Sequence, residues 1–276
     1  MQDFSLEITA KDADAVLEAK ANIAPGTRIN VTFLGNEAPG ERVNTAKTVK
    51  DSGFIPVPHL AARRIKSTEE FTSILTSLQE AGVSEHLFLI AGDPATPEGP
   101  FEDVHALIKS VDLKEFGVKD VGISGYPEGH PDISTEKLDQ AFINKTKALQ
   151  EQNLDAVVIT QFAFDADAVI AWIRKARGMG YAGLIRVGTP GPAGVKRLLR
   201  YASRFGIASS AGIVRKYGFS LTNLMGTAGP DKFIKNLQSE LDADPTLGPV
   251  ALHFYTFGGL NATAEWAKGF IAKEGK

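Results

Sequence analysis

Short apolar runs alternate with amphipathic stretches along the chain. Short runs rich in branched and aromatic residues are typical of buried strands, and apolar residues recurring every three or four positions are typical of helices. Eight runs are expected to form strands: Phe4–Ile8, Arg28–Phe33, Phe54–Val57, His86–Ile90, Val118–Ser124, Ala156–Thr160, Leu184–Val187 and Val250–Tyr255.

A helix is expected after each strand. The segments are Lys11–Asn22, Glu41–Asp51, Ser67–Ala81, Glu102–Ser110, Thr135–Gln152, Ala166–Arg177, Ala193–Phe205 and Leu260–Ala272. Ser67 is the expected cap of the third helix, with Glu70 as its capping-box partner. A longer insertion before the last strand carries a mixed segment, Ile207–Met225, and a further helix, Pro230–Leu241.

This alternation predicts the fold class. Eight strand–helix repeats are the number in a (β/α)₈ TIM-type barrel, here with an extra helical segment before the last strand. We expect one catalytic domain over residues 1–276, because no linker-like change of composition interrupts the pattern. A doubly wound sheet is the alternative, but it normally uses fewer strands or splits into two halves.

Composition excludes several classes of function. The 30 basic and 33 acidic residues give a net charge of -3, which disfavours nucleic acid and anionic membrane as partners. The absence of cysteine excludes disulfides and thiol chemistry. The chain shows neither a signal-peptide pattern nor an apolar run near the ~18 residues of a membrane span. We therefore expect a cytoplasmic protein.

Polar residues gather where the expected strands end. In a barrel these positions share one edge, whatever their distance in sequence. The residues are Glu7, Thr32, His59, Asp93, Tyr126, Glu128, His130, Gln161 and Tyr255. Two of them, Tyr126 and His130, belong to the loop Gly122–Asp132, whose prolines and glycines restrict the backbone. We expect these side chains to form a site.

Glu7 is the most informative of these residues. In the run Phe4–Ile8, alternation turns Ser5 and Glu7 toward the barrel interior when Phe4, Leu6 and Ile8 face the helices. A carboxyl group partly removed from water can keep the proton that a general acid supplies. The alternative is a carboxylate paired with a buried lysine or arginine. Asp93 has turn capping as its alternative role, and the amide of Gln161 needs a ligand or backbone partner if buried.

Common sequence motifs for other chemistries are missing. The chain has no phosphate-binding Gly-x-x-x-x-Gly-Lys motif, and the glycines at 188, 191 and 194 lack dinucleotide-fold spacing. His59 and His130 lack metal-ligand spacing, so no metal site is expected. No serine stands in a nucleophile elbow.

Several ordered motifs resemble the methylenetetrahydrofolate reductase family along nearly the whole chain. They are Ser5-Leu6-Glu7, Val31-Thr32-Phe33 with Gly40-Glu41-Arg42, Pro58-His59-Leu60, Gly92-Asp93-Pro94, the run Gly125 to Pro131, Ile159-Thr160-Gln161-Phe162 with Phe164-Asp165, and His253-Phe254-Tyr255-Thr256. The resemblance implies a flavin-dependent barrel enzyme, a homo-oligomer, with a tetrahydrofolate derivative as substrate. It would reduce 5,10-methylenetetrahydrofolate to 5-methyltetrahydrofolate with NADH or NADPH, by ping-pong hydride transfer through FAD.

The resemblance also implies roles for single residues. Glu7 matches the general acid, Asp93 a carboxylate near flavin and pterin, and Gln161 a residue that contacts folate and nicotinamide in turn. Tyr255 joins Asp93 and Gln161 as a substrate contact. The positions that match flavin contacts are Thr32, His59, Gly92, Asp93, Tyr126, His130, Asp139 and Lys145.

Two departures from the family pattern leave alternatives open. Ala91 stands where an arginine usually supports the flavin, and Phe257-Gly258-Gly259 stands where an arginine is expected near folate. Arg63, Arg64 or Arg197 are the candidates to replace these cations. The alternative functions are a flavin-independent, folate-linked one-carbon enzyme of the same barrel, and a non-catalytic flavin- or folate-binding protein.

Overall fold

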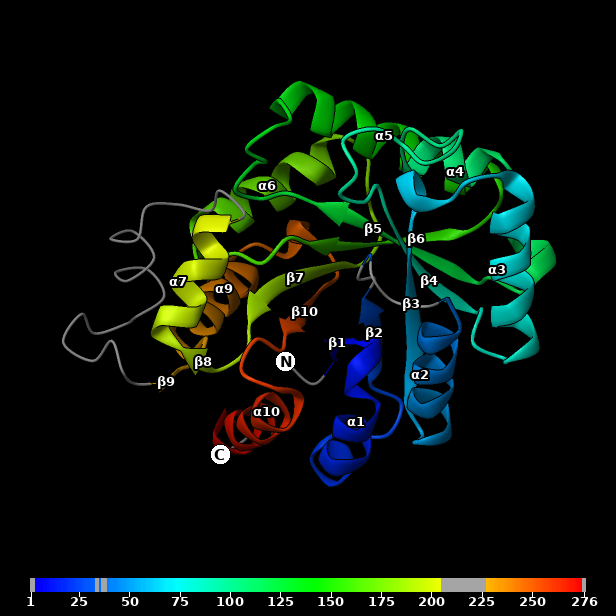
Figure 1. Ribbon diagram of the computed structural model, residues 1–276. Helices are drawn as coiled ribbons and strands as arrows, with labels where there is room; N and C mark the ends of the chain where they lie inside the picture. Colours follow the sequence, from blue (N-terminus) through cyan, green and yellow to red (C-terminus); the bar gives the residue numbers. More distant parts are fainter. Residues whose placement is uncertain (1–2, 33–34, 36–38, 205–226, 275–276) are drawn as a thin grey trace.

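Eight parallel strands close into a barrel in the computed structural model, which describes residues 3–32, 35, 39–204 and 227–274. The order around the barrel is β1-β10-β7-β6-β5-β4-β3-β2. The strands are β1 Phe4–Thr9, β2 Arg28–Thr32, β3 Ile55–Ala61, β4 His86–Ile90, β5 Asp120–Gly125, β6 Asp155–Thr160, β7 Ile185–Pro190 and β10 Val250–Tyr255. Figure 1 shows the strands running through the middle of the molecule with helices around them. The predicted (β/α)₈ barrel is confirmed.

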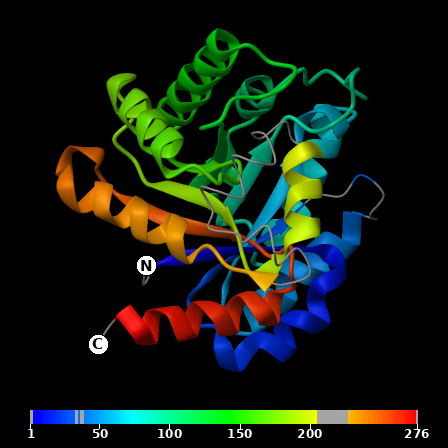
Figure 2. The same ribbon diagram turned by 90° about the vertical axis from the view of Figure 1, so that its left-hand side faces the viewer.

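The helices follow the strands as the alternation predicts. They are α1 Ala13–Ala19, α2 Pro39–Asp51, α3 Thr68–Glu80, α4 Val104–Lys109, α5 Thr135–Glu151, α6 Ala166–Gly178, α7 Val195–Arg204, α9 Asp231–Ala243 and α10 Leu260–Glu274. Figure 2 shows α9, in orange, as an additional helix on the outside of the barrel, and it packs against α6. No helix in the described ranges has the length and apolar character needed to cross a membrane.

The start of the expected helix Ala193–Phe205 differs from the expectation. Residues 193–194, expected at the start of a helix, form the short strand β8 Ala193–Gly194, which pairs antiparallel with β9 Thr227–Ala228. The helix α7 therefore begins at Val195. The mixed segment Ile207–Met225 lies outside the described residues.

Side-chain alternation separates the two faces of β1. Phe4, Leu6 and Ile8 are buried in the core between strands and helices, as expected. Ser5 and Glu7 point into the barrel, where they meet histidines from other strands. A second, smaller apolar cluster of Val57, Phe88 and Ile159 fills part of the barrel interior. These apolar side chains lie beside polar ones, since Val57 pairs with Asn30 and Phe88 pairs with His59.

Strand β3 is longer than the sequence indicated. The expected strand ended at Val57, just before Pro58. The strand instead continues to Ala61, since the fixed proline φ is compatible with extended backbone. This correction moves His59 from a loop into the strand, where its side chain is 2% exposed.

The cap of α3 is confirmed, with one difference. The Ser67 hydroxyl accepts a hydrogen bond from the Glu70 backbone amide. The Glu70 carboxylate accepts from the Lys66 amide instead of closing the capping box on Ser67. Both contacts satisfy donors at the start of the helix.

Charged side chains fill the amino-terminal end of the barrel. Arg28 donates two hydrogen bonds to Asp120, at 2.9 and 2.8 Å, and His86 Nδ1 lies 2.7 Å from Asp120 Oδ2. Burial alone raises the pKa of Asp120, but His86 and Arg28 outweigh it and lower that pKa to about 2. Arg186, buried nearby, pairs with Asp3 at 3.0 Å. This network stabilises the end opposite the predicted site.

Candidate functional site

Glu7 lies at the centre of the carboxyl-terminal mouth of the barrel. Its Oε2 atom is 3.6 Å from Nε2 of His253 on β10 and 4.0 Å from Nε2 of His59 on β3. The Glu7 side chain is 18% exposed, whereas both histidines are buried. Within the described part of the chain, no lysine or arginine contacts this carboxylate. The alternative role for Glu7, pairing with a buried cation, is not observed.

Neighbouring side chains hold the two histidines. The Ser5 hydroxyl lies 2.8 Å from His253 Nδ1, and Asn30 Nδ2 lies 3.0 Å from His59 Nε2. Burial lowers the pKa of His59 well below its usual value, and the proximity of His253 and Arg42 adds to this effect. His59 is therefore neutral at neutral pH.

Two tyrosines complete the mouth. The Tyr255 hydroxyl donates to the Thr160 carbonyl at 3.1 Å. Burial raises the pKa of Tyr255 well above its usual value, with further contributions from Glu7 and Tyr126, which places all three groups near one another. Burial also raises the pKa of Tyr126, partly offset by a hydrogen bond with Ser124. Both phenols remain protonated at neutral pH and can donate hydrogen bonds.

Thr32 and Gln161 stand at the expected strand ends. Thr32 is the last residue of β2 and is half-buried. Gln161 follows β6, and its side-chain oxygen accepts a hydrogen bond from the Phe162 backbone amide at 3.1 Å. The backbone amide of Gln161 donates to the Gly125 carbonyl at 2.7 Å. The structure thus supplies the backbone partner that the sequence left open.

Asp93 turns away from Glu7. Gly92 adopts a left-handed conformation with φ of +96°, which begins a sharp turn after β4. Beyond it, the Asp93 carboxylate accepts two 2.9 Å hydrogen bonds from Arg64 and is 76% exposed. Arg64 also contacts Glu98, so it ties together both ends of the loop after β4. Asp93 therefore has a structural partner that its position in the sequence did not reveal.

The predicted flavin contacts after β5 and on α5 do not lie together. His130 packs edge-on against Tyr126, with ring centroids 5.6 Å apart, and its Nδ1 accepts from the Asp132 amide. Asp139, on α5, forms a 2.6 Å ion pair with Lys175 on α6. Lys145, two turns further along α5, is buried; burial lowers its pKa to about 8, although Asp103 acts in the opposite direction. Asp139 and Lys145 thus meet different neighbouring elements and do not converge.

An aromatic wall extends from the mouth to α7. We use this name for Phe162, Tyr255, Phe257 and Tyr201. The ring of Phe257 lies 5.2 Å from that of Phe162 and 5.7 Å from that of Tyr255, and Tyr201 stacks on Phe257 at 4.0 Å with an angle of 8°. Phe162 is buried and meets Phe257 edge-on, whereas Tyr201, Tyr255 and Phe257 are partly exposed and can contact an aromatic ligand.

Sequence reasoning missed His253, Asn30 and Phe257 as site residues. A signal for the first two was present. His253 lies two residues before Tyr255 and Asn30 two before Thr32, so strand alternation places them on the same inward faces. Phe257 lies in the loop beyond β10, where alternation gives no signal, and the sequence singled out its position only as one that lacks an expected arginine.

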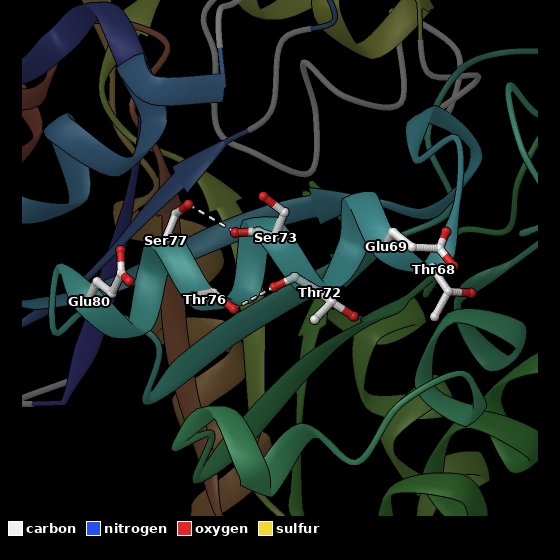
Figure 3. A pocket seen from close by; sticks show the side chains of 7 residues that line it. All are labelled: Thr68, Glu69, Thr72, Ser73, Thr76, Ser77 and Glu80. Carbon is white, nitrogen blue, oxygen red and sulfur yellow. Dashed lines mark hydrogen bonds between the residues drawn. The ribbon is translucent and has the colours of Figure 1, made fainter.

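A separate hollow of about 520 Å³ lies on the outer face of α3. Figure 3 shows its lining of hydroxyl and carboxyl groups from Thr68 to Glu80. The hydroxyls of Thr76 and Ser77 donate to carbonyls one turn earlier in the helix. None of the residues at the barrel mouth lines this hollow.

Solved structures share the fold at low sequence identity. A Clostridium thermocellum protein that binds two copies of 5-methyl-5,6,7,8-tetrahydrofolic acid superposes with a TM-score of 0.66 at 13% identity, covering 99% of this chain and 95% of that one. Dihydropteroate synthase from Thermus thermophilus superposes with a TM-score of 0.50 at 13% identity, over 99% and 93% of the two chains. These likenesses concern the barrel itself.

Sequence relatives point to one family. The chain is 28% identical to 5,10-methylenetetrahydrofolate reductase of Pectobacterium carotovorum over 177 residues, 63% of this chain and 57% of that protein. It is 32% identical to methylenetetrahydrofolate reductase 2 of Saccharomyces cerevisiae over 108 residues, 35% of this chain and 17% of that protein. The chain thus spans less than two thirds of the length of these relatives. The family model for methylenetetrahydrofolate reductase matches residues 18–203, and the chain therefore belongs to the methylenetetrahydrofolate reductase family.

Proposed function

We propose that this protein reduces the methylene carbon of 5,10-methylenetetrahydrofolate to a methyl group, with NADH or NADPH as the source of hydride. The observation that carries the proposal is the placement of Glu7. Its carboxyl group opens to the mouth and faces two buried histidines, and no basic side chain among the described residues holds it as a carboxylate. Relatives named as reductases support the same reaction class.

Glu7 would act as the general acid. Its proton passes to the folate nitrogen that leaves the methylene carbon, so the five-membered ring opens and an iminium ion remains. A hydride then adds to the iminium carbon, which becomes the methyl group, while the nicotinamide is oxidised. A proton supplied at the moment of bond breaking lowers the barrier to such a step, typically by a factor of about 10² to 10⁴ in rate.

The other residues of the mouth would orient the reactants. Tyr255 and Tyr126 keep their protons at neutral pH, so they can donate to polar edges of the pterin. Gln161 would contact folate and nicotinamide in turn if its side chain leaves the Phe162 amide. Asp93 would stabilise the cation by its charge. For that role Asp93 must exchange its contact with Arg64, which holds it in the structure.

FAD, which the resemblance implies as hydride carrier, fits the described residues only in part. At the mouth side of the barrel, Thr32 is the last residue of its strand, and Gly92, Tyr126 and His130 follow theirs. The two α5 residues do not fit, because Asp139 is paired with Lys175 and Lys145 is buried without converging on it. Ala91 supplies no cation beside them. We therefore assign no step of the reaction to FAD.

This disagreement favours a second route, in which hydride passes directly from the nicotinamide to the iminium carbon. Both routes need the same acid, Glu7, and the same folate orientation. They differ in whether one reactant must leave before the other binds. The non-catalytic alternative, a flavin or folate binder, has less support because Glu7 lies beside two buried histidines, an arrangement that suits proton transfer. From the resemblance we also infer a homo-oligomer.

The test begins with the colour of the purified protein. Bound oxidised flavin absorbs near ~450 nm, and bleaching by NADH followed by reoxidation with methylenetetrahydrofolate would support the FAD route. A colourless protein that still forms methyltetrahydrofolate from both substrates would establish the direct route. Failure to form methyltetrahydrofolate with NADH or NADPH, with FAD added, would overturn the proposed function.

A further inference from the structure

The loop after β6 carries Gln161, and two neighbouring strands hold its first half. The Gln161 backbone amide donates to the Gly125 carbonyl of β5 at 2.7 Å, and the Ala163 amide donates to the Gly188 carbonyl of β7 at 3.0 Å. The Gly188 amide donates to the Thr160 hydroxyl at 2.8 Å. A Cβ atom at Gly188 would lie 2.3 Å from the Thr160 carbonyl oxygen, so this close approach requires glycine.

A side chain from another loop holds the second half. The Glu128 carboxylate, in the segment between β5 and α5, accepts a 3.0 Å hydrogen bond from the Phe164 backbone amide. Phe164 is buried, and its ring lies edge-on to that of Phe162, with centroids 5.9 Å apart. The next residue, Asp165, caps α6. Glu128 thus contacts the loop where the chain passes from the mouth of the barrel into α6.

A tight turn directs Glu128 toward this amide. The Gly129 amide donates to the Tyr126 carbonyl at 3.1 Å, so Pro127 and Glu128 are the two central residues of a four-residue turn. Gly129 has a φ of +81°, which glycine adopts without strain. Tyr126, at the start of the turn, lies near Tyr255 at the mouth, whereas Glu128 contacts the neighbouring loop. The proposed reaction gives Glu128 no step of its own.

The contact at Phe164 gains importance when Gln161 engages a reactant. Of the amides of residues 161–164, two donate to barrel carbonyls, that of Phe162 donates to the Gln161 side-chain oxygen at 3.1 Å, and that of Phe164 donates to Glu128. Turning the Gln161 side chain toward a ligand removes the acceptor of the Phe162 amide. The hydrogen bond to Glu128 does not depend on that movement, so it continues to hold the second half of the loop.

We propose that Glu128 is a positioning residue, which holds the loop after β6 through the Phe164 amide so that Gln161 stays at the mouth while its side chain changes partners. The proposal rests on the proposed function, in which Gln161 contacts folate and nicotinamide in turn. The contact needs only an acceptor oxygen, which glutamine also carries. Glu128→Gln should therefore preserve the hydrogen bond, and Glu128→Ala should remove it.

Two measurements test the proposal, and one of them is independent of activity. Hydrogen–deuterium exchange is measured at the amides of residues 162–164 in the unsubstituted chain, Glu128→Ala and Glu128→Gln. The value of kcat/KM for methylenetetrahydrofolate is measured in the same proteins, in Gln161→Ala and in the double variant Glu128→Ala/Gln161→Ala. The control is Gln152→Ala, whose side-chain oxygen accepts from the Leu113 amide at 3.0 Å in the segment before β5, at the amino-terminal end of the barrel.

We expect Glu128→Ala to speed exchange at residues 162–164 at least tenfold and to lower kcat/KM at least tenfold. Glu128→Gln should stay within threefold of the unsubstituted chain in both measurements. In the Gln161→Ala background, Glu128→Ala should change kcat/KM less than twofold further, because the side chain that it positions is already gone. Gln152→Ala should change neither kcat/KM nor the exchange at residues 162–164.

Unchanged exchange in Glu128→Ala, or independent losses of kcat/KM in the double variant, would overturn the positioning role alone. A Glu128→Gln variant as impaired as Glu128→Ala would also overturn it, because the charge and not the hydrogen bond would then matter. An equal loss of kcat/KM in Gln152→Ala would reduce the effect to general stability and would likewise refute the role. If the unsubstituted chain formed no methyltetrahydrofolate, the proposed function would fail, and the positioning of Gln161 with it.

Discussion

The Nε2 atom of His253 lies 3.6 Å from Oε2 of Glu7, and the opposite nitrogen of the same ring lies 2.8 Å from the Ser5 hydroxyl. Three side chains from two adjacent strands thus form a line that ends at the mouth. The Nε2 atom is buried and, among the described residues, has no hydrogen-bond partner within normal distance. A small movement of Glu7 would close this gap, so His253 is placed to orient the proposed acid.

Replacing Glu7 tests the acid directly. We expect Glu7→Gln to lower kcat for folate reduction about 10² to 10⁴-fold, because the amide has no acidic proton to give. Binding of 5-methyltetrahydrofolate, measured by calorimetry, should persist. If flavin is bound, its bleaching by NADH should also persist. Glu18→Gln on the exposed face of α1 is the matched control, and equal loss of both half-reactions in Glu7→Gln would count against the acid role.

His253→Gln should impair the reaction without removing the acid. Because His253 touches Glu7 and not the reacting atoms, we expect kcat to fall about tenfold to a hundredfold with little change in KM. The pH profile of kcat should shift, which a loss of packing alone would not cause. His105→Gln, on α4, serves as control. An unchanged kcat and pH profile in His253→Gln would remove His253 from the proton path.

The buried, neutral His59 predicts a pH dependence of stability. The pKa of His59 is lower in the folded chain than in the unfolded chain. Below pH about 6.5 the unfolded chain therefore binds a proton at His59 that the folded chain does not bind. This group's contribution to the free energy of unfolding is complete above pH about 6.5 and decreases as pH falls below that value, by at most about 1.4 kcal/mol per pH unit. Urea unfolding of the unsubstituted chain and of His59→Gln between pH 5 and 7 measures the difference. Equal slopes in the two proteins would refute the assignment.

The network at the amino-terminal end of the barrel predicts a separate stability effect. The pKa of Asp120 is lowered from 3.8 to about 2, so its contribution is present above pH 3.8 and is lost as pH falls toward 2. We expect Asp120→Asn to lower the free energy of unfolding at pH 7 by about 2 to 3 kcal/mol. Asp51→Asn, which removes an exposed ion pair with Lys47, should cost less than about 0.5 kcal/mol. Similar losses in the two variants would contradict this account.

Replacing Lys145 tests both its effect on stability and its predicted contact with flavin. Its pKa is lowered from 10.5 to about 8 by burial, so a charged lysine is unfavourable below pH 8 and the penalty fades as pH rises toward 10.5. Lys145→Met should therefore raise the free energy of unfolding at pH 7, by about 2 to 3 kcal/mol. Flavin affinity should not change, because Lys145 faces α4. Weakened flavin binding in this variant would show that the lysine reaches the cofactor.

The sequence predicted the barrel well because its strands are short, apolar and separated by amphipathic helices. It placed the end of the third strand at Val57, whereas pairing with β2 and β4 extends β3 through Pro58 to Ala61. Side-chain alternation along the first strand was enough to predict that Glu7 points into the barrel. It could not predict that Arg64, from the preceding loop, holds Asp93 outward, because such pairing depends on side chains brought together only by the fold. For the same reason the resemblance could not predict that Asp139 and Lys145 contact different neighbouring elements.

The parallel pairing of β1 with β10 sets Glu7 beside Tyr255 and Ser5 beside His253, and the Thr256 hydroxyl donates to the Glu7 carbonyl at 2.6 Å. During synthesis Glu7, on the first strand of the barrel, leaves the ribosome early in the making of the barrel, whereas its partners on β10 follow only after the other seven strands. The proposed proton-transfer site therefore cannot form on the partly made chain. Catalytic competence would therefore appear in a single late event, when the last strand seals the ring, and enzyme activity during refolding would report that closure.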